Sequence, residues 1–333
     1  MRRPCFILCC CCVGLAGCHA VSPVEEINQS ELNTATVTEV QLVTIKAGEL
    51  AMSMGDYDEA LKIFKEVIGQ NPVAADAFVG VGDIYLIKKN WKNAEPVFAR
   101  AVKLDPRNFD AHYGHAVSLQ MLKKFIDAVR AYHRALTINP EDMGANMNIA
   151  TTYLQMGKPK SALVFAERAV GLEGKIAPAQ ITLAATYQLL GRTQDALKAY
   201  IAASEHMDEP SPRLMRSIIS LLTKEKRYQE VANTASALIQ LEPTSEAYEQ
   251  LGWAEFRLGD YEASLRAYKT AVGYNQNNWR ALNGIGVNEL NSWLLGDKTN
   301  PEAYQTASTV FRRSLEIHPD QQKVITLVLR YDL

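Results

Sequence analysis

Cysteine has the strongest capacity for chemistry in this chain, and all six cysteines lie close to its start. They are Cys5, the contiguous run at residues 9–12, and Cys18. A structural zinc site pairs one C-x₂₋₄-C motif with a second, and a disulfide needs a cysteine elsewhere to pair with. No cysteine follows Cys18, so we expect neither a metal site nor a disulfide framework. Within the run, cysteine serves as a small hydrophobic residue.

The flanks of this run have the order of a secretory signal peptide. Arg2 and Arg3 supply positive charge, residues 4–14 are almost entirely apolar or cysteine, and small residues precede Cys18. The apolar stretch is too short to span a bilayer. The residues Leu15, Ala16, Gly17 and Cys18 resemble the lipobox of bacterial lipoproteins. That resemblance implies removal of residues 1–17 and lipidation of Cys18; plain cleavage and secretion is the alternative.

Histidine is the next candidate for chemistry. His112 and His115 are three residues apart on one expected helix, and His133 falls on the next. A metal site is one hypothesis, but no carboxylate or cysteine completes a ligand set at suitable spacing. Both His112 and His115 fall at positions where the pattern expects large apolar residues. Packing and hydrogen bonds to helix ends explain them better.

Composition and missing motifs argue against other function classes. The 333 residues are 47% hydrophobic and 22% charged with a net charge of −2, which becomes −4 without Arg2 and Arg3. Such a balance gives no attraction for nucleic acid. The longest uncharged stretch after Cys18, residues 176–191, is too short for a membrane span. The pairs Gly80 with Gly82 and Gly284 with Gly286 lack the context of a phosphate loop, so we interpret them as packing glycines. We expect no enzyme, cofactor, metal or small-molecule substrate.

A repeat with a period of 34 residues organises most of the chain. One small residue recurs in each of eight segments, and a proline follows twelve residues later in five of them. Within residues 75–108, Phe78, Val81, Gly82 and Tyr85 share one helix face, and a second helix ends before Pro106. Each unit is therefore a pair of helices. The small residues are Ala60, Ala94, Ala128, Ala162, Ala196, Val231, Ser264 and Ala307.

This pattern resembles the tetratricopeptide repeat, in which large-x-x-Leu-Gly-x-x-Tyr is followed by Ala-x-x-x-Phe-x-x-Ala and then Pro. The resemblance implies an all-α, right-handed α-solenoid of about eight helical hairpins with one concave surface. We expect a signal peptide at residues 1–17, a lipidated tether at 18–40, the solenoid at 41–320 and a capping helix at 321–333. Thr36 and Glu39 are expected to cap the first helix.

Two units depart from the pattern. The sixth carries Ile218 and Ile219 where Leu-Gly is expected, and Val231 where the other units have alanine or serine. The eighth contains about nine extra residues between its helices, around Trp293. We expect the extra residues to form a long loop.

The resemblance also implies which residues line the concave surface, because the first helix of each unit faces it. In the middle of the chain these positions form an apolar strip interrupted by Asn148, and further on they are rich in arginine and aromatic residues, which often anchor interfaces. Arg213 and Arg216 have an alternative role as ion-pair partners of Glu246 and Glu249. The predicted groove residues are Tyr113, Met121, Met147, Asn148, Thr151, Leu154, Ile181, Leu189, Arg213, Arg216, Lys224, Glu249, Trp253, Phe256 and Arg257.

We therefore expect a non-catalytic interaction scaffold, lipid-anchored in the bacterial cell envelope and facing the periplasm. Its partner would be a protein, in a complex of the pilus, outer-membrane or polysaccharide-export type. His19 follows the lipidated cysteine, and the absence of aspartate there favours the outer membrane. Two alternatives remain open. One is a holdase-like binder of unfolded or translocating peptides, suggested by the methionines of the strip. The other is a histidine-based metal protein or enzyme.

Overall fold

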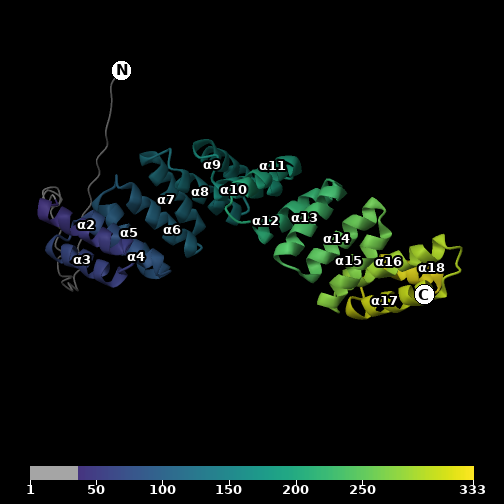
Figure 1. Ribbon diagram of the computed structural model, residues 1–333. Helices are drawn as coiled ribbons and strands as arrows, with labels where there is room; N and C mark the ends of the chain where they lie inside the picture. The colour runs from purple at the N-terminus through teal and green to yellow at the C-terminus, as the bar shows by residue number, and fades with distance from the viewer. Residues whose placement is uncertain (1–36) are drawn as a thin grey trace, which may run out of the picture.

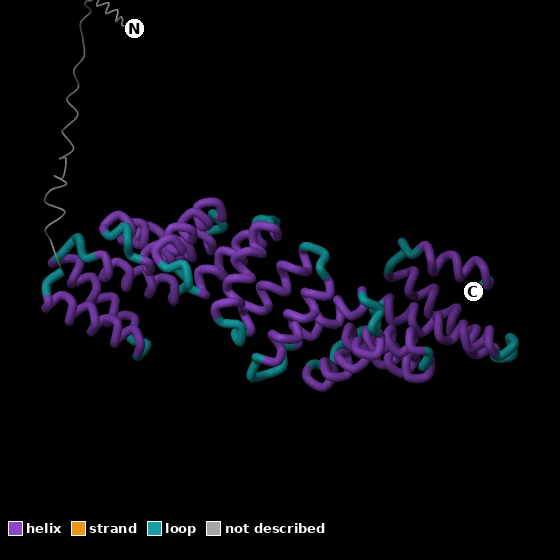
Figure 2. The backbone as a smooth tube through the Cα atoms, turned by 90° about the horizontal axis from the view of Figure 1, so that it is seen from above, coloured by secondary structure: helices purple, strands orange, loops and turns teal. Residues whose placement is uncertain are grey.

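The structure is a computed structural model that describes residues 37–333. These residues form α-helices joined by short turns, with no β-strand among them. The helices pack as sequential hairpins in single file from α2 to α18 (Figure 1), and a view turned by 90° shows the same elongated arrangement (Figure 2). The predicted all-α solenoid is confirmed. The predicted signal and lipidation residues at 1–18 lie outside the described residues.

Each hairpin consists of a first helix and a second helix. The first helices are α2 (Glu39–Ser53), α4 (Ala75–Ile87), α6 (Phe109–Met121), α8 (Met143–Gln155), α10 (Ala177–Leu189), α12 (Pro212–Lys224), α14 (Ser245–Leu258) and α16 (Trp279–Leu295). The second helices are α3 (Tyr57–Gln70), α5 (Trp91–Leu104), α7 (Phe125–Ile138), α9 (Pro159–Leu172), α11 (Thr193–Glu205), α13 (Tyr228–Leu241), α15 (Tyr261–Tyr274) and α17 (Pro301–Ile317). A single helix, α18 (Gln322–Tyr331), follows the last pair.

The start of α2 differs from the prediction. Thr38 is the N-cap and forms a capping box with Gln41: its hydroxyl accepts from the Gln41 N–H at 3.2 Å, and its own N–H donates to the Gln41 side chain at 3.1 Å. The predicted pair Thr36 and Glu39 is wrong, because Glu39 is already the first helical residue. A capping box satisfies the N–H groups of its own N-cap and N3 residues, and the actual box lies two residues later than the predicted one.

The turn inside each of the first seven hairpins is made by one residue in the left-handed backbone region. Its φ lies between 54° and 89°, and it recurs at close to 34-residue spacing. Glycine adopts this conformation without steric cost, whereas a lysine there costs roughly 1 kcal/mol. This shared geometry makes each second helix turn back along its first helix. The residues are Gly55, Lys89, Lys123, Gly157, Gly191, Lys226 and Gly259.

Buried aromatic rings between small residues hold neighbouring hairpins together. Phe98 on α5 is completely buried, and its ring lies against both Gly82 of its own unit and Gly114 of the next. A Cβ atom built on either glycine would come within 2.6 Å of the ring. Phe64 sits in the same way between Gly48 and Gly80, as Tyr268 does between Gly252 and Gly284. The interpretation of the paired glycines as packing residues is confirmed.

The eight small residues that marked the repeat are all buried. They lie on the second helices, where a larger side chain would hold the two helices of a hairpin apart. Their role is the same as that of the glycines on the first helices, since both allow close approach of helix backbones.

The C-terminal end of the stack is closed by α18, as predicted. Val324 and Leu333 are buried against Leu290 and Phe311 of the last hairpin. The Tyr304 hydroxyl donates to the backbone carbonyl of Tyr331 at 3.1 Å. These contacts cover the outer face of α17, so the last hairpin is not left with an open apolar side.

The extra residues of the eighth hairpin do not form the long loop that we predicted. They lengthen both helices, so α16 and α17 have 17 residues each, and only residues 296–300 connect them. Trp293 lies within α16, and its ring packs 5.0 Å from that of Tyr304 and 6.4 Å from that of Tyr331. Trp293 therefore joins α16 to the capping helix.

The spacing between first helices is uneven. Adjacent first helices approach each other closely from α2 to α10 and again from α14 to α16, but α12 stands further from both α10 and α14. The position on the first helix that packs against its second helix is glycine or alanine in seven hairpins, such as Gly82, Ala116 and Gly252, and is Ile219 in α12. The larger side chain prevents the close approach of α12 to its own second helix, α13, that the small residues permit in the other hairpins.

Candidate partner-binding groove

The predicted groove residues all lie on first helices, as expected from the pattern. Tyr113 and Met121 are on α6; Met147, Asn148 and Leu154 on α8; Ile181 and Leu189 on α10; Arg213 and Arg216 on α12; and Trp253, Phe256 and Arg257 on α14. They are not equally available to a partner. Met121 and Leu189 are 43% and 61% exposed, whereas Tyr113, Leu154 and Ile181 are half-buried against the hairpin cores.

Tyr113 and Asn148 join two neighbouring first helices. The Asn148 side-chain amide donates to the Tyr113 hydroxyl at 2.8 Å, and the Tyr113 ring stacks on Phe109 with a centroid distance of 5.8 Å. Burial raises the pKa of the Tyr113 hydroxyl. These two residues therefore stabilise the groove wall between α6 and α8, and only their remaining exposed surface is accessible from the groove.

A second set of hydrogen bonds between α6 and α8 lies beside Tyr113 and Asn148, and the sequence analysis did not identify it. The Tyr132 hydroxyl donates to the buried side chain of Gln120 at 2.7 Å, and the Gln120 amide donates to Gln155 on α8 at 3.1 Å. Burial raises the pKa of Tyr132 strongly, so the hydroxyl stays neutral. The recurrence of an aromatic residue every 34 positions could have identified Tyr132, but its hydrogen-bond partner depends on the packing of three helices.

The best-formed hollow of the groove lies between α12 and α14, where the first helices stand apart. It has a volume of about 450 Å³. Its floor is apolar, with Ile219, Leu238 and Ala247, and α12 contributes one polar wall. The residues of that wall are Arg216, Ser220, Thr223 and Lys224, and Glu246 and Gln250 lie opposite on α14. We call this the groove hollow.

The charges in the groove hollow are arranged differently from the prediction. Arg216 forms an ion pair with Glu242 at 2.7 Å, and not with Glu246 or Glu249. The Thr223 hydroxyl oxygen is buried and has no hydrogen-bond partner among residues 37–333. An unpaired buried hydroxyl costs free energy until a partner satisfies it. The hollow therefore combines an apolar floor with polar groups that an incoming backbone or side chain can engage.

Trp253 and Arg257 are partly engaged in internal contacts. Both meet Tyr228 at the start of α13: the Trp253 ring packs edge-on at 5.3 Å, and the Arg257 guanidinium donates to the Tyr228 hydroxyl at 2.7 Å. The same guanidinium lies 4.8 Å from the Tyr228 ring centroid. Phe256 packs against Tyr261 at 5.3 Å. This cluster fixes α14 beside the groove hollow.

The N-terminal part of the groove is acidic, which the sequence analysis did not single out. Asp83 lies on α4, and burial, together with the nearby Asp110, raises the pKa of its carboxyl to about 7. The pKa of Asp110 is also raised, first by burial and then by Asp76 and Asp142. The groove thus runs from an acidic region at α4 and α6 to a region on α12 that carries Arg213, Arg216 and Lys224.

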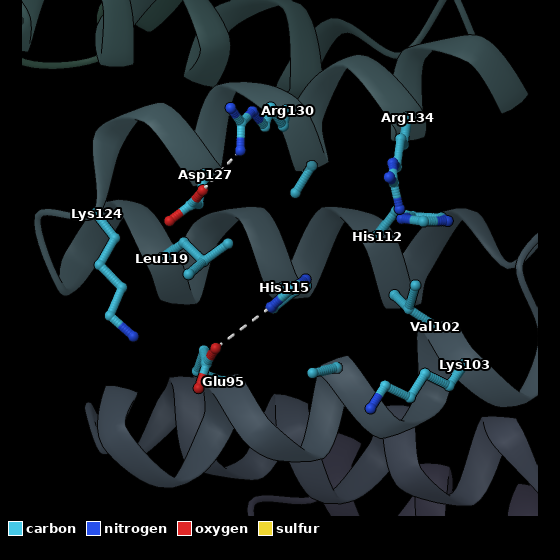
Figure 3. A pocket seen from close by; sticks show the side chains of 12 residues that line it. Glu95, Val102, Lys103, His112, His115, Leu119, Lys124, Asp127, Arg130 and Arg134 are labelled. Atoms are coloured by element: carbon cyan, nitrogen blue, oxygen red, sulfur yellow. Dashed lines mark hydrogen bonds and ion pairs between the residues drawn. The ribbon is translucent and has the colours of Figure 1, made fainter. Parts of the chain in front are cut away.

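His112 and His115 lie outside the groove, in a separate hollow of about 390 Å³ between α5, α6 and α7 (Figure 3). His112 is buried, and its Nε2 donates to the Pro106 carbonyl at 3.1 Å. His115 Nε2 lies 3.6 Å from Glu95, and His133 contacts the Tyr153 hydroxyl at 3.2 Å. Figure 3 shows Arg134 and Lys103 on opposite walls near His112. Across residues 37–333, no three metal-ligating side chains are grouped to hold an ion.

Replacing His115 with leucine should make the protein more resistant to acid. Burial lowers the pKa of His115, only partly opposed by Glu95, so the unfolded chain binds a proton more readily than the folded one. Stability is then complete above the unfolded pKa of about 6.5 and falls as the pH drops. His115→Leu removes this loss and adds about 1 kcal/mol of apolar burial. Urea unfolding of both proteins at pH 5 and pH 8 measures the free energy of unfolding. If the loss of stability from pH 8 to pH 5 is the same in the variant as in the unaltered protein, the prediction is wrong.

No helix within residues 37–333 combines the length and the apolar character needed to cross a membrane. Models of the tetratricopeptide repeat match residues 45–109, 110–142, 144–175 and 249–291. Together these matches cover just over half of the chain. None of the curated proteins compared matches it.

Several solved structures share the arrangement of helices. PilF from Pseudomonas aeruginosa is 20% identical, with a TM-score of 0.56 over 64% of this chain and 96% of that one. PilW, described as a widely conserved type IV pilus biogenesis factor, is 18% identical, with a TM-score of 0.57 over 63% and 97%. A tetratricopeptide repeat protein from Parabacteroides merdae is 16% identical, with a TM-score of 0.51 over 75% and 99%. At these identities the likeness shows the fold alone.

Proposed function

Because the chain belongs to the tetratricopeptide repeat proteins, we propose that it is a non-catalytic scaffold that binds an extended segment of a protein partner along its first helices. Such repeats present a long concave surface, and binding specificity comes from the side chains on it. The predicted groove residues on α6, α8, α10, α12 and α14 lie on this surface and form our proposed contact set.

The groove hollow is the observation that carries this proposal. Hollows with an apolar floor and a few polar groups are the usual form of a binding site. Here the floor of Ile219, Leu238 and Ala247 suits one apolar side chain of the partner, and the exposed Ser220 and Lys224 of the α12 wall are available to its polar groups. The acidic region near Asp83 and the basic side chains of α12 favour a segment whose ends carry opposite charges.

We further propose that the scaffold is held at the cell envelope by a lipid on Cys18, facing the periplasm, with the outer membrane as its site. Support comes from the charge, apolar stretch and Leu-Ala-Gly-Cys order of residues 1–18. Two or more acyl chains give stable anchoring, since each buried methylene contributes about 0.8 kcal/mol. Residues 18–40 act as a tether to the solenoid at 41–320. An envelope complex of the pilus, outer-membrane or polysaccharide-export type is the proposed setting.

Photo-crosslinking in intact cells tests both parts of the proposal. A photoreactive side chain at Ser220, in the groove hollow, should give one dominant adduct in the membrane fraction. The same group at Ser236, exposed on the second helix α13, is the matched control and should give none. With Cys18→Ser the protein and its adduct should leave the membrane fraction.

Each outcome of this experiment has a defined meaning. Equal adducts from Ser220 and Ser236 would contradict groove binding. A broad mixture of envelope proteins from Ser220 would favour the holdase alternative, for which the exposed Met121 and Leu189 provide an adaptable apolar surface. Retention of the Cys18→Ser protein in the membrane fraction would contradict lipid anchoring while leaving groove binding intact.

A further inference from the structure

The first helix of the stack carries an apolar face that nothing covers within the described residues. Val40, Val43, Leu50 and Met54 are 75%, 63%, 61% and 74% exposed, and Ala47 is exposed between them. Their spacing of three and four residues places them on a single stripe along α2. Large apolar stripes on a soluble surface mark sites of association. We call this stripe the α2 face.

The other seven hairpins show the role of the equivalent face on their first helices. The residues equivalent to Val43 and to Leu50 are buried in every one of them, because each packs against the preceding hairpin. The equivalents of Val43 are Ala77, Ala111, Ala145, Ala179, Leu214, Ala247 and Ala281. The equivalents of Leu50 are Ile84, Ser118, Thr152, Thr186, Leu221, Ala254 and Asn288. Among residues 37–333, the α2 face is therefore a stacking surface without a preceding hairpin.

The two ends of the stack differ in whether their apolar face is covered. At the C-terminal end α18 covers the last hairpin through Val324 and Leu333. A terminal repeat that remains open to water requires a polar outer face, yet α2 has valine, leucine and methionine there. Since α18 occupies the complementary end, a second molecule cannot stack head to tail on α2. Two α2 faces can meet each other, because such contacts use the same surface on both copies.

The stripe has the spacing required for pairing with an identical helix. Residues 40, 43, 47, 50 and 54 alternate by three and four, which is the a and d pattern of a two-helix seam. Ala47 lies at the centre of the stripe, where a small side chain allows the two backbones to approach. Thr44 and Ala51, on one flank, add no bulk or charge.

We propose that two copies of this protein associate through their α2 faces, giving a symmetric dimer joined at the N-terminal ends of the solenoids. The lipid anchor proposed at Cys18 is compatible with this dimer. Only this statement about the membrane rests on the proposed function. Cys18 precedes α2 by about 20 residues, so both copies hold the same end near the membrane. The pairing itself does not require the lipid.

Substitution at Ala47 tests the dimer with the full chain in detergent. Sedimentation velocity should show the unaltered protein as a dimer, and both Ala47→Lys and Ala47→Glu as monomers, with a dissociation constant weaker by about tenfold or more. An equimolar mixture of the two variants should restore the dimer, because opposite charges then meet at the centre. Ala237→Lys, on an exposed position of α13, is the control and should remain dimeric.

Three results would overturn the proposal. They are a monomeric unaltered protein, a dimer that survives both Ala47 variants, and a mixture that stays monomeric. Circular dichroism of each variant should show unchanged helix content, because Ala47 is exposed and its replacement disturbs no core contact. All of these readouts are independent of Cys18 and of the groove, so a failure of the dimer and a failure of the proposed function are distinguishable.

Discussion

Gly114→Val should destabilise the protein by about 3 kcal/mol and loosen the first two hairpins from the rest of the stack. A Cβ atom at residue 114 would lie 2.3 Å from the Phe98 ring, and that ring cannot retreat because Gly82 is packed against its other side. Overpacking of a full core typically costs 1–3 kcal/mol, and a β-branched side chain makes the conflict larger. Because each hairpin contacts only its neighbours, the damage falls on the contact between α5 and α6.

Denaturant unfolding and amide hydrogen exchange of the full chain measure this effect. Exchange should accelerate in α2 to α5 well before it does in α14 to α17. Gly171→Val is the matched control, since Gly171 lies within α9 and a Cβ there meets nothing within 4 Å. An equal stability of the two variants would mean that the Phe98 ring is free to move, contrary to its complete burial.

Asp83→Asn should stabilise the protein by about 2 kcal/mol at pH 8 and have little effect at pH 4. Burial raises the pKa of Asp83 from 3.8 to about 7. The folded chain therefore binds this proton more tightly than the unfolded chain between these values. Stability is fully present below about pH 4 and is lost as the pH rises to about 7. The amide carries no charge at any of these pH values, so the variant avoids both the buried charge and its repulsion from Asp110.

Urea unfolding of both proteins between pH 4 and pH 8 checks the sign and the size. The difference between variant and unaltered protein should grow steadily across this range and level off above pH 7. Asp320→Asn, at an exposed position outside the helices, is the control and should follow the unaltered protein. A variant that is less stable at pH 8 would show that Asp83 makes a favourable contact as an anion.

Sequence periodicity was sufficient to predict the helical hairpins, because each packing rule repeats with them. The small residue on the second helix, the glycines opposite Phe98 and the proline after five of the units all report on local contacts within one or two hairpins. The sequence also identified the sixth hairpin as the most divergent, through Ile219. That α12 stands apart from its neighbouring first helices, and that Ile219 lines a hollow there, could not be predicted, since both depend on how three helices pack together.

The remaining differences between prediction and structure have one cause. Several residues had more than one possible contact, and the sequence does not show which contact forms. Arg216 had several carboxylates within reach along the chain, and the fold places Glu242 nearest to it. Trp293 was assigned to a loop because the insertion broke the period, but Leu294 and Leu295 continue the apolar pattern and extend α16. The pKa of Asp83 depends on its burial and on the charge of Asp110, which lies in the next hairpin. Sequence spacing determines which residues share a helix face, whereas these properties depend on distances between helices.

The separation of α12 from α10 and α14 also has a mechanical consequence. A solenoid bends by changing the angle between successive hairpins, and its resistance to bending at each joint increases with the packing across that joint. The joint between the fifth and sixth hairpins has the weakest packing, because α11 and α12 make the least contact of any successive hairpins and α10 stands apart from α12, so the solenoid is most compliant there. Tension along the stack would widen the concave side at this place first. A segment that runs along the first helices from α10 to α12 would connect both sides of this joint and so hold the curvature of the whole protein.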